Sequence, residues 1–214
     1  MFCTTNKIIF CLLCAKNALY IQNNRSEIKG FGDVLHLSNN LSRRLDIGDI
    51  DDEIGDAVDN IIRFWNRVDD EANIPVEKRE PIKLYINSNG GALTGGLKII
   101  DAIQLSKTPV YTINTGMAYS AGFFIFITGK ERFAYPNSSF LFHEGSISMG
   151  VSDAGKFRNY ANFYEKLLVK LKDITLGNTK MTEDDYEAHK KDDRWFLADE
   201  ALELGICDKI LTTF

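Results

Sequence analysis

The sequence predicts an α/β protein in which helices connect parallel strands. Two stretches support this, each running from an apolar strand through a turn of small residues into an apolar helix. The first begins at Ile82 and the second at Pro109. A repeated order of strand, turn and helix is typical of parallel strands joined by right-handed crossovers. Binding sites in such sheets form at the carboxyl ends of strands, where both turns would lie.

The first predicted helix spans residues 51–70 and is amphipathic. Its apolar side chains recur at helical spacing, and Asp49, Asp51 and Asp52 favour its N-terminus electrostatically. A charged stretch with two prolines follows over residues 71–81 and predicts a loop.

The first strand-to-helix unit begins with alternating residues over 82–87. Gly90 and Gly91 then form a tight turn into a helix whose apolar face begins at Leu93. The apolar positions of this helix are Leu93, Leu97, Ile100 and Ile103.

The second unit has a predicted strand over 110–114, which Gly116 is expected to end. Residues 117–122 then form a turn into a buried helix over 123–127. The other predicted elements are short strands at 132–135 and 139–143, a long amphipathic helix at 153–174, a helix from Thr182 to about 191, and a last helix at 199–204.

Composition excludes several classes of function. A net charge of −5 argues against general binding to nucleic-acid backbones, which requires clustered Lys and Arg. Four cysteines are too few for a disulfide framework in 214 residues, so we expect a reducing, cytoplasmic compartment. The chain has no Walker-type phosphate loop.

Residues 1–42 form an unassigned N-terminal segment ahead of the predicted domain of residues 43–214. Cys11 and Cys14 have the spacing of half a zinc or redox site, but no second cysteine pair follows, so we expect no metal. The apolar run 8–15 is too short to span a bilayer. A leader, a propeptide and a divergent gating loop all stay open as interpretations of this segment.

Ser120 is the candidate nucleophile, because it occupies a small-residue turn between a strand and a helix. A serine hydroxyl needs an adjacent base at neutral pH. His143 at a strand end is better placed for this role than His36 or His189. An aspartate must then orient the imidazole. Asp193 is a candidate, and Asp173, Asp184, Asp185 and Asp192 compete with it on sequence alone.

Several motifs together resemble the family of the Clp protease proteolytic subunit (ClpP). The resemblance covers roughly residues 45–211. A divergent or phage-type member of the family is one of the interpretations. The motifs are Tyr85–Gly91, Gly116–Gly122, Arg132–Ser138, Phe142–His143, Asp193–Leu197 and Glu200–Asp208.

The resemblance implies a crotonase-like fold of repeated strand-strand-helix units, with a projecting handle helix at 153–174. It also implies Ser120 as nucleophile, His143 as general base and Asp193 as orienting carboxylate. The backbone N–H groups of Gly91 and Ala121 would form the oxyanion hole. The implied activity is hydrolysis of peptide bonds in small or unfolded polypeptides through an acyl-enzyme, without a metal or organic cofactor.

The resemblance further implies a homo-oligomer of stacked rings that works with a separate ATP-driven unfoldase ring. One departure from the family pattern stands beside the histidine, where Glu144-Gly145 replaces a Gln-Pro pair and adds a negative charge.

Two alternative functions stay open on sequence. One is a membrane-associated protease similar to signal-peptide peptidase A, although His143 and Asp193 in matching contexts oppose it and a membrane partner is not expected. The other is a non-catalytic ring protein or an acyl-CoA-binding crotonase relative. The complete set of Ser120, His143 and Asp193 argues against this second alternative.

Overall fold

The computed structural model describes residues 43–145, 153–190 and 192–213. The N-terminal segment lies outside these residues, and with it the cysteine pair Cys11 and Cys14 and the apolar run 8–15. Within the described part of the chain, every helix is too short or too polar to cross a membrane.

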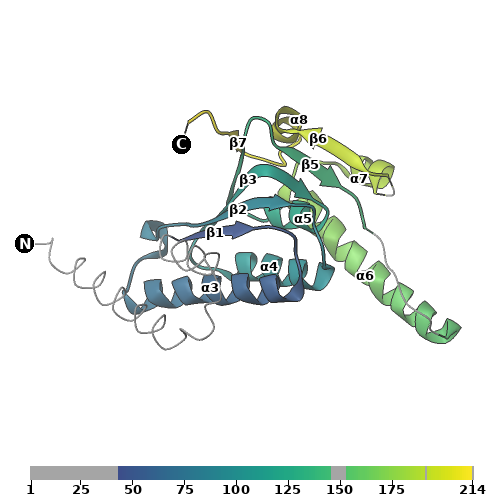
Figure 1. Cartoon of the computed structure of the whole chain (residues 1–214), viewed down its shortest axis with the longest axis horizontal. Helices are drawn as coiled ribbons and strands as arrows, with labels where there is room; N and C mark the ends of the chain where they lie inside the picture. The colour runs from purple at the N-terminus through teal and green to yellow at the C-terminus, as the bar shows by residue number, and fades with distance from the viewer. Residues whose placement is uncertain (1–42, 146–152, 191, 214) are drawn as a thin grey trace, which may run out of the picture. The chain divides into compact units, whose positions relative to one another are not determined.

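A single sheet of seven strands forms the centre of the described domain (Figure 1). Five strands are parallel neighbours in one row, and two further strands extend the sheet from the end of β3. The row is β1 (Arg44–Ile47), β2 (Ile82–Ser88), β3 (Val110–Tyr119), β4 (Glu131–Ala134) and β7 (Lys209–Ile210); β5 (Ser139–Phe142) pairs in parallel with β3, and β6 (Arg194–Leu197) pairs antiparallel with β5.

Helices connect these strands as the sequence predicts. Figure 1 shows α3 and α4 running along one side of the sheet, while α6 extends away from it. The helices are α3 (Asp52–Glu71), α4 (Leu93–Leu105), α5 (Ala121–Ile127), α6 (Ala154–Asn178), α7 (Glu183–His189) and α8 (Ala198–Glu203), with a short 3₁₀ turn at Val76–Lys78. The long helix α6 ends four residues later than expected.

The core lies between the sheet and the helices that cover it. The alternating strand β2 buries Ile82, Leu84 and Ile86 completely. Every residue of α5 is buried, which explains why its sequence is apolar on all sides rather than amphipathic. This buried helix fixes the position of its own N-terminus, where Ser120 lies.

The prediction that Gly116 ends the second strand is wrong. Strand β3 continues to Tyr119, because its last residues leave β4 and pair with β5 instead. Glycine is required at 116 by a close approach, since a Cβ there would lie 2.6 Å from Oδ1 of Asn87. The Asn87 amide oxygen accepts a hydrogen bond from Met117 N where the register between β2 and β3 shifts.

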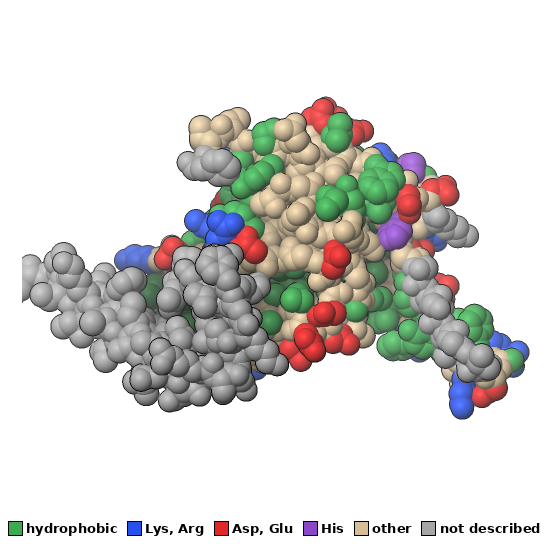
Figure 2. Space-filling model, viewed as in Figure 1, with side chains coloured by type: hydrophobic (Ala, Val, Ile, Leu, Met, Phe, Trp, Pro, Cys, Tyr) green, Lys and Arg blue, Asp and Glu red, His purple; other side chains and the backbone are tan. Residues whose placement is uncertain are grey.

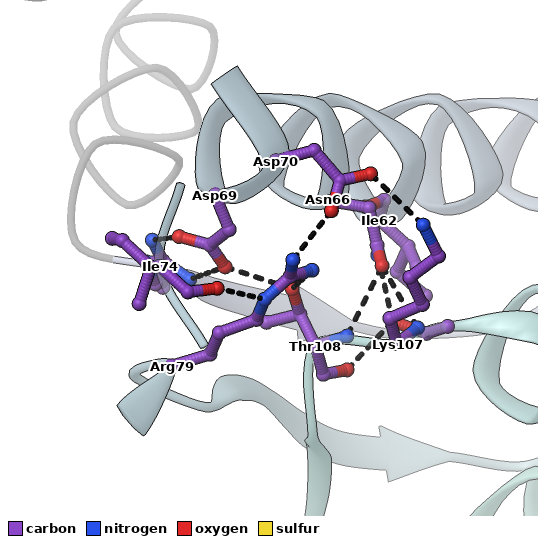
Figure 3. A network of polar contacts seen from close by, with 10 residues as sticks. Ile62, Asn66, Asp69, Asp70, Ile74, Arg79, Lys107 and Thr108 are labelled. Atoms are coloured by element: carbon purple, nitrogen blue, oxygen red, sulfur yellow. Dashed lines mark hydrogen bonds and ion pairs between the residues drawn. The ribbon is translucent and has the colours of Figure 1, made fainter. Parts of the chain in front are cut away.

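A buried polar network fastens the end of α3 and the following loop to the start of β3 (Figure 3). Asp69 is fully buried and accepts hydrogen bonds from Arg43 and from Thr108 Oγ1, the latter at 2.7 Å. Arg79 in the loop donates to Ile74 O and pairs with Asp70. Burial by itself raises the pKa of Asp69, but these hydrogen bonds outweigh it and lower the pKa.

Candidate active site

Ser120 lies between β3 and α5 in a backbone conformation that residues other than glycine rarely adopt. Its φ is +52°, and such strain costs about 1 to 3 kcal/mol. Two contacts hold this conformation: Ser120 N donates to Leu141 O at 3.0 Å, and Ser120 O accepts from the first turn of α5. Gly90 makes room for it, because a Cβ there would lie 2.8 Å from the Ser120 Cβ.

His143 directly follows β5, the strand that pairs with the end of β3. Its Nε2 lies 2.8 Å from Ser120 Oγ and its Nδ1 lies 3.0 Å from Asp193 Oδ1. With the proton on Nδ1, the imidazole donates to Asp193 and can accept the hydroxyl proton of Ser120 at Nε2. The geometry is therefore that of a nucleophile, a base and an orienting carboxylate.

The register between β5 and β6 explains why Asp193 reaches the histidine. Phe142 pairs with Arg194 in this antiparallel ladder, so the next residues outward, His143 and Asp193, lie opposite each other. Asp192 lies outside the ladder at a bend, where its N–H donates to His189 O at 3.2 Å. Sequence alone could not select between these two aspartates because the register was not visible in it.

The other residues that competed for these roles lie elsewhere. Asp173 belongs to α6, and Asp184 and Asp185 belong to the first turn of α7, where Asp185 forms a capping box with Thr182. His189 is the last residue of α7. His36 lies outside the described residues.

The two expected oxyanion donors are the backbone N–H groups of Gly91 and Ala121. Gly91 is bridged to Ile50, but the bonds are made by Gly90 O and Ala92 N, so the Gly91 N–H points away from Ile50. Ala121 is the first residue of α5, and its N–H has no acceptor within the helix. Gly91 and Ala121 both line the cavity that Ser120 lines.

This cavity has a volume of about 450 Å³ and is mainly apolar. Sequence reasoning missed one wall of this cavity, because the long helix was expected to project as a handle. The wall comes from α5 and α6 and consists of Phe124, Tyr160, Phe163, Tyr164, Leu167 and Leu171. A pocket of this size and lining accepts an apolar side chain next to Ser120.

The described residues contain no group of three or more His, Cys, Asp and Glu side chains arranged to hold a metal ion. The site consists of one strained serine, one histidine, one aspartate and the backbone N–H groups of Gly91 and Ala121. This arrangement suits acyl transfer, in which a serine attacks a carbonyl and N–H groups stabilise the resulting oxyanion.

Comparisons with known proteins point the same way. A family model described as Clp protease matches residues 74–214. The ATP-dependent Clp protease proteolytic subunit 2 of Tropheryma whipplei is 33% identical over 138 residues, which cover 64% of this chain and 76% of that protein. Subunit 3 of Streptomyces avermitilis is 35% identical over 168 residues, covering 75% and 73%, respectively.

Proposed function

The chain belongs to the Clp protease family and is a serine-type peptidase, and on this premise we propose that Ser120, His143 and Asp193 are its catalytic triad. The observation that carries the proposal is the unbroken contact from Ser120 Oγ through the imidazole to the Asp193 carboxylate. Three separate segments of the chain contribute to it.

In the proposed mechanism, His143 Nε2 takes the hydroxyl proton as Ser120 Oγ attacks the scissile carbonyl carbon. Asp193 stabilises the imidazolium that forms, and His143 then returns the proton to the leaving amine. The N–H groups of Gly91 and Ala121 stabilise the tetrahedral oxyanion, each worth about 2.7 to 4 kcal/mol. Water activated by the same imidazole then releases the acyl group from Ser120.

The proposal extends to substrate and assembly. We propose that small or unfolded polypeptides reach the site inside a cytoplasmic homo-oligomer of stacked rings, served by a separate ATP-driven unfoldase. Support comes from α6, whose N-terminal half is exposed and carries apolar side chains, including Phe157 at 50% and Phe163 at 54% exposure. Figure 2 shows hydrophobic side chains at the surface along this helix. Exposed aromatic residues of this kind favour burial against another subunit.

The two alternative functions have less support. A Ser-Lys protease would place a lysine at Ser120 Oγ, where this chain has His143. A non-catalytic relative is disfavoured by the match to the Clp protease family model.

The decisive experiment asks whether one serine is activated. Wild-type protein and Ser120→Ala are treated with a fluorophosphonate probe and analysed by intact mass. We expect one adduct on the wild type and none on the variant. Light scattering of the same samples should give the same oligomer for both, because the loss of one hydroxyl barely affects packing. An unlabelled wild-type oligomer would contradict the proposed triad, and a monomer would contradict the proposed assembly.

A further inference from the structure

Glu144, the residue after His143, is tied to two helices through its backbone. Its N–H donates to Lys190 O at 3.1 Å, and its carbonyl accepts from the Tyr164 hydroxyl at 3.0 Å. Lys190 is the C-cap residue that follows α7, and Tyr164 belongs to α6. The chain directly beyond the proposed base is therefore fixed at a second point, in addition to the β5–β6 ladder.

The contact to Lys190 also concerns the proposed orienting carboxylate. Asp193 follows Lys190 by three residues, so the segment that carries the aspartate starts at the same junction. The Glu144–Lys190 contact and the ladder pair of Phe142 with Arg194 together hold the two segments on both sides of the His143–Asp193 contact. Movement at this junction would change the distance between imidazole and carboxylate.

Tyr186 on α7 packs against the end of β5, the strand that leads to His143 and Glu144. It is 1% exposed, and its ring packs on Phe142 with 5.1 Å between ring centroids. Its hydroxyl makes no hydrogen bond of normal geometry to any described residue. Burial raises the pKa of Tyr186 above its ordinary value, and the negative charge of Glu144 raises it further. Tyr186 and Glu144 are also linked through Lys190, whose N–H donates to Tyr186 O and whose carbonyl accepts from Glu144 N.

Nearby charged side chains are already paired with other partners. Lys190 Nζ lies 2.6 Å from Glu187, and Lys172 Nζ binds both Glu183 and Glu187. Among described side chains, the buried polar atoms without a partner are the Tyr186 hydroxyl and Trp65 Nε1. Leaving a buried hydroxyl unpaired costs about 1 to 3 kcal/mol, which favours its pairing with the adjacent carboxylate.

We propose that Glu144 and Tyr186 act together as a positioning pair for the triad. The Tyr186 hydroxyl donates to the Glu144 carboxylate and so anchors the end of β5 to α7, which keeps His143 at hydrogen-bond distance from Asp193. Neither residue touches the reacting atoms. The inference rests on the proposed function, because it concerns the alignment of that triad.

The test is a double-mutant cycle with Tyr186→Phe, Glu144→Ala and the double variant, measured as kcat and KM on a small fluorogenic peptide. Misplacement of a catalytic group by about 1 Å can cost roughly 10²-fold in rate. For these partial losses of anchoring we expect kcat to fall about 10-fold, with KM within about twofold of wild type. The double variant should lose no more than the worse single variant, because both changes break one contact.

Glu144→Gln provides the rescue, since its amide oxygen still accepts from the Tyr186 hydroxyl and most of kcat should return. Tyr111→Phe is the matched control, because the Tyr111 hydroxyl donates to Glu131 Oε1 at 3.2 Å away from the site. This control should keep wild-type kcat. The rate of fluorophosphonate labelling at Ser120 gives a second measure, which does not depend on peptide binding.

Wild-type kcat in Tyr186→Phe, or losses that multiply in the double variant, would overturn the positioning pair. The failure of the proposed function would look different, because wild-type protein would then take no label at Ser120. Thermal unfolding of each variant shows whether a lost activity comes from a lost fold. If Tyr186→Phe does not fold, Glu144→Ala against Glu144→Gln still tests the proposal, and equal kcat in those two variants would overturn it.

Discussion

The two ends of β3 carry polar clusters that differ in burial and in strain. Before the strand begins, Thr108 bonds to Asp69 (Figure 3), which also pairs with Arg43, and all three residues are buried. After the strand ends, strained Ser120 contacts a histidine whose partner, Asp193, has a side chain that is 57% exposed. The first cluster has nearly all its hydrogen bonds made inside the protein, while the second keeps atoms available to a substrate.

This difference separates stability from activity along one strand. Buried, paired charges contribute to the fold because removing one partner leaves the other uncompensated. Half-exposed groups contribute little to stability, so changes there should alter catalysis and leave the fold intact. Four predictions test this separation, in order of decreasing effect.

At the carboxyl end of β3, Asp193→Asn should lower kcat by about 10⁴-fold, since an amide cannot hold the imidazole in the required tautomer. The free energy of unfolding should stay within about 0.5 kcal/mol of wild type, as for other exposed positions. Asp192→Asn is the matched control and should keep its activity. Comparable losses of kcat in both variants would contradict the assignment of Asp193 as the orienting carboxylate.

At the other end, Asp69→Ala should lower the free energy of unfolding by about 3 to 5 kcal/mol, because Arg43 would stay buried without its partner. Urea titration measures this effect. On the same helix, Asp59→Ala breaks the pair with Arg63, whose side chain is 67% exposed, and should cost less than about 1 kcal/mol. Equal costs for the two variants would show that the network contributes no more than a surface pair.

Acid should act on the same network. The pKa of Asp69 is lowered from 3.8 in the folded protein, so its contribution to stability is complete above that value. The contribution is lost as the pH falls through the lower folded pKa. The unfolding free energy of wild type should therefore fall more steeply with decreasing pH below about 4 than that of Asp69→Asn. Parallel slopes for the two proteins would contradict the prediction.

The smallest effect should come from Ser120→Gly, which relieves the strain at φ +52° while abolishing peptide hydrolysis. We expect a gain of up to about 1 kcal/mol in unfolding free energy, because part of the relief is offset by the greater freedom of glycine in the unfolded chain. A variant less stable than wild type would show that the strain at Ser120 is not a cost to the fold.

Much of the fold could be predicted from sequence, because the periodic segments are strong. The α/β plan is confirmed, and the Clp protease family gives it as the crotonase-like fold. The helices α3 and α4 lie where their apolar spacing places them, and α5 begins two residues before the apolar run that predicted it, within the expected turn. The strands β1, β6 and β7 were not predicted, since each has at most four residues and depends on its neighbours for its structure.

The candidate site shows the same limit. Local signals made Ser120 and His143 candidates, because a turn of small residues and a strand end can be seen in sequence. The choice of Asp193 and the contribution of Tyr164 to the cavity depend on register and on the packing of α6, which join distant parts of the chain. Gly116 misled the prediction because glycine is found both in chain turns and where a side chain, here that of Asn87, approaches the backbone closely.

The first part of β3 pairs with β4 and its end pairs with β5, so the proposed catalytic groups attach to two parts of the sheet. Ser120, His143 and Asp193 all attach to the part formed by the end of β3 with β5 and β6. The Gly91 donor lies beyond the end of β2 and is bridged to Ile50, beyond the end of β1. A displacement of Gly91 relative to the end of β3 would leave the serine nucleophilic but separate it from one oxyanion donor. Such an enzyme would still react with a fluorophosphonate while hydrolysing peptides slowly. Labelling would then report on the triad, and turnover would also report on the position of Gly91.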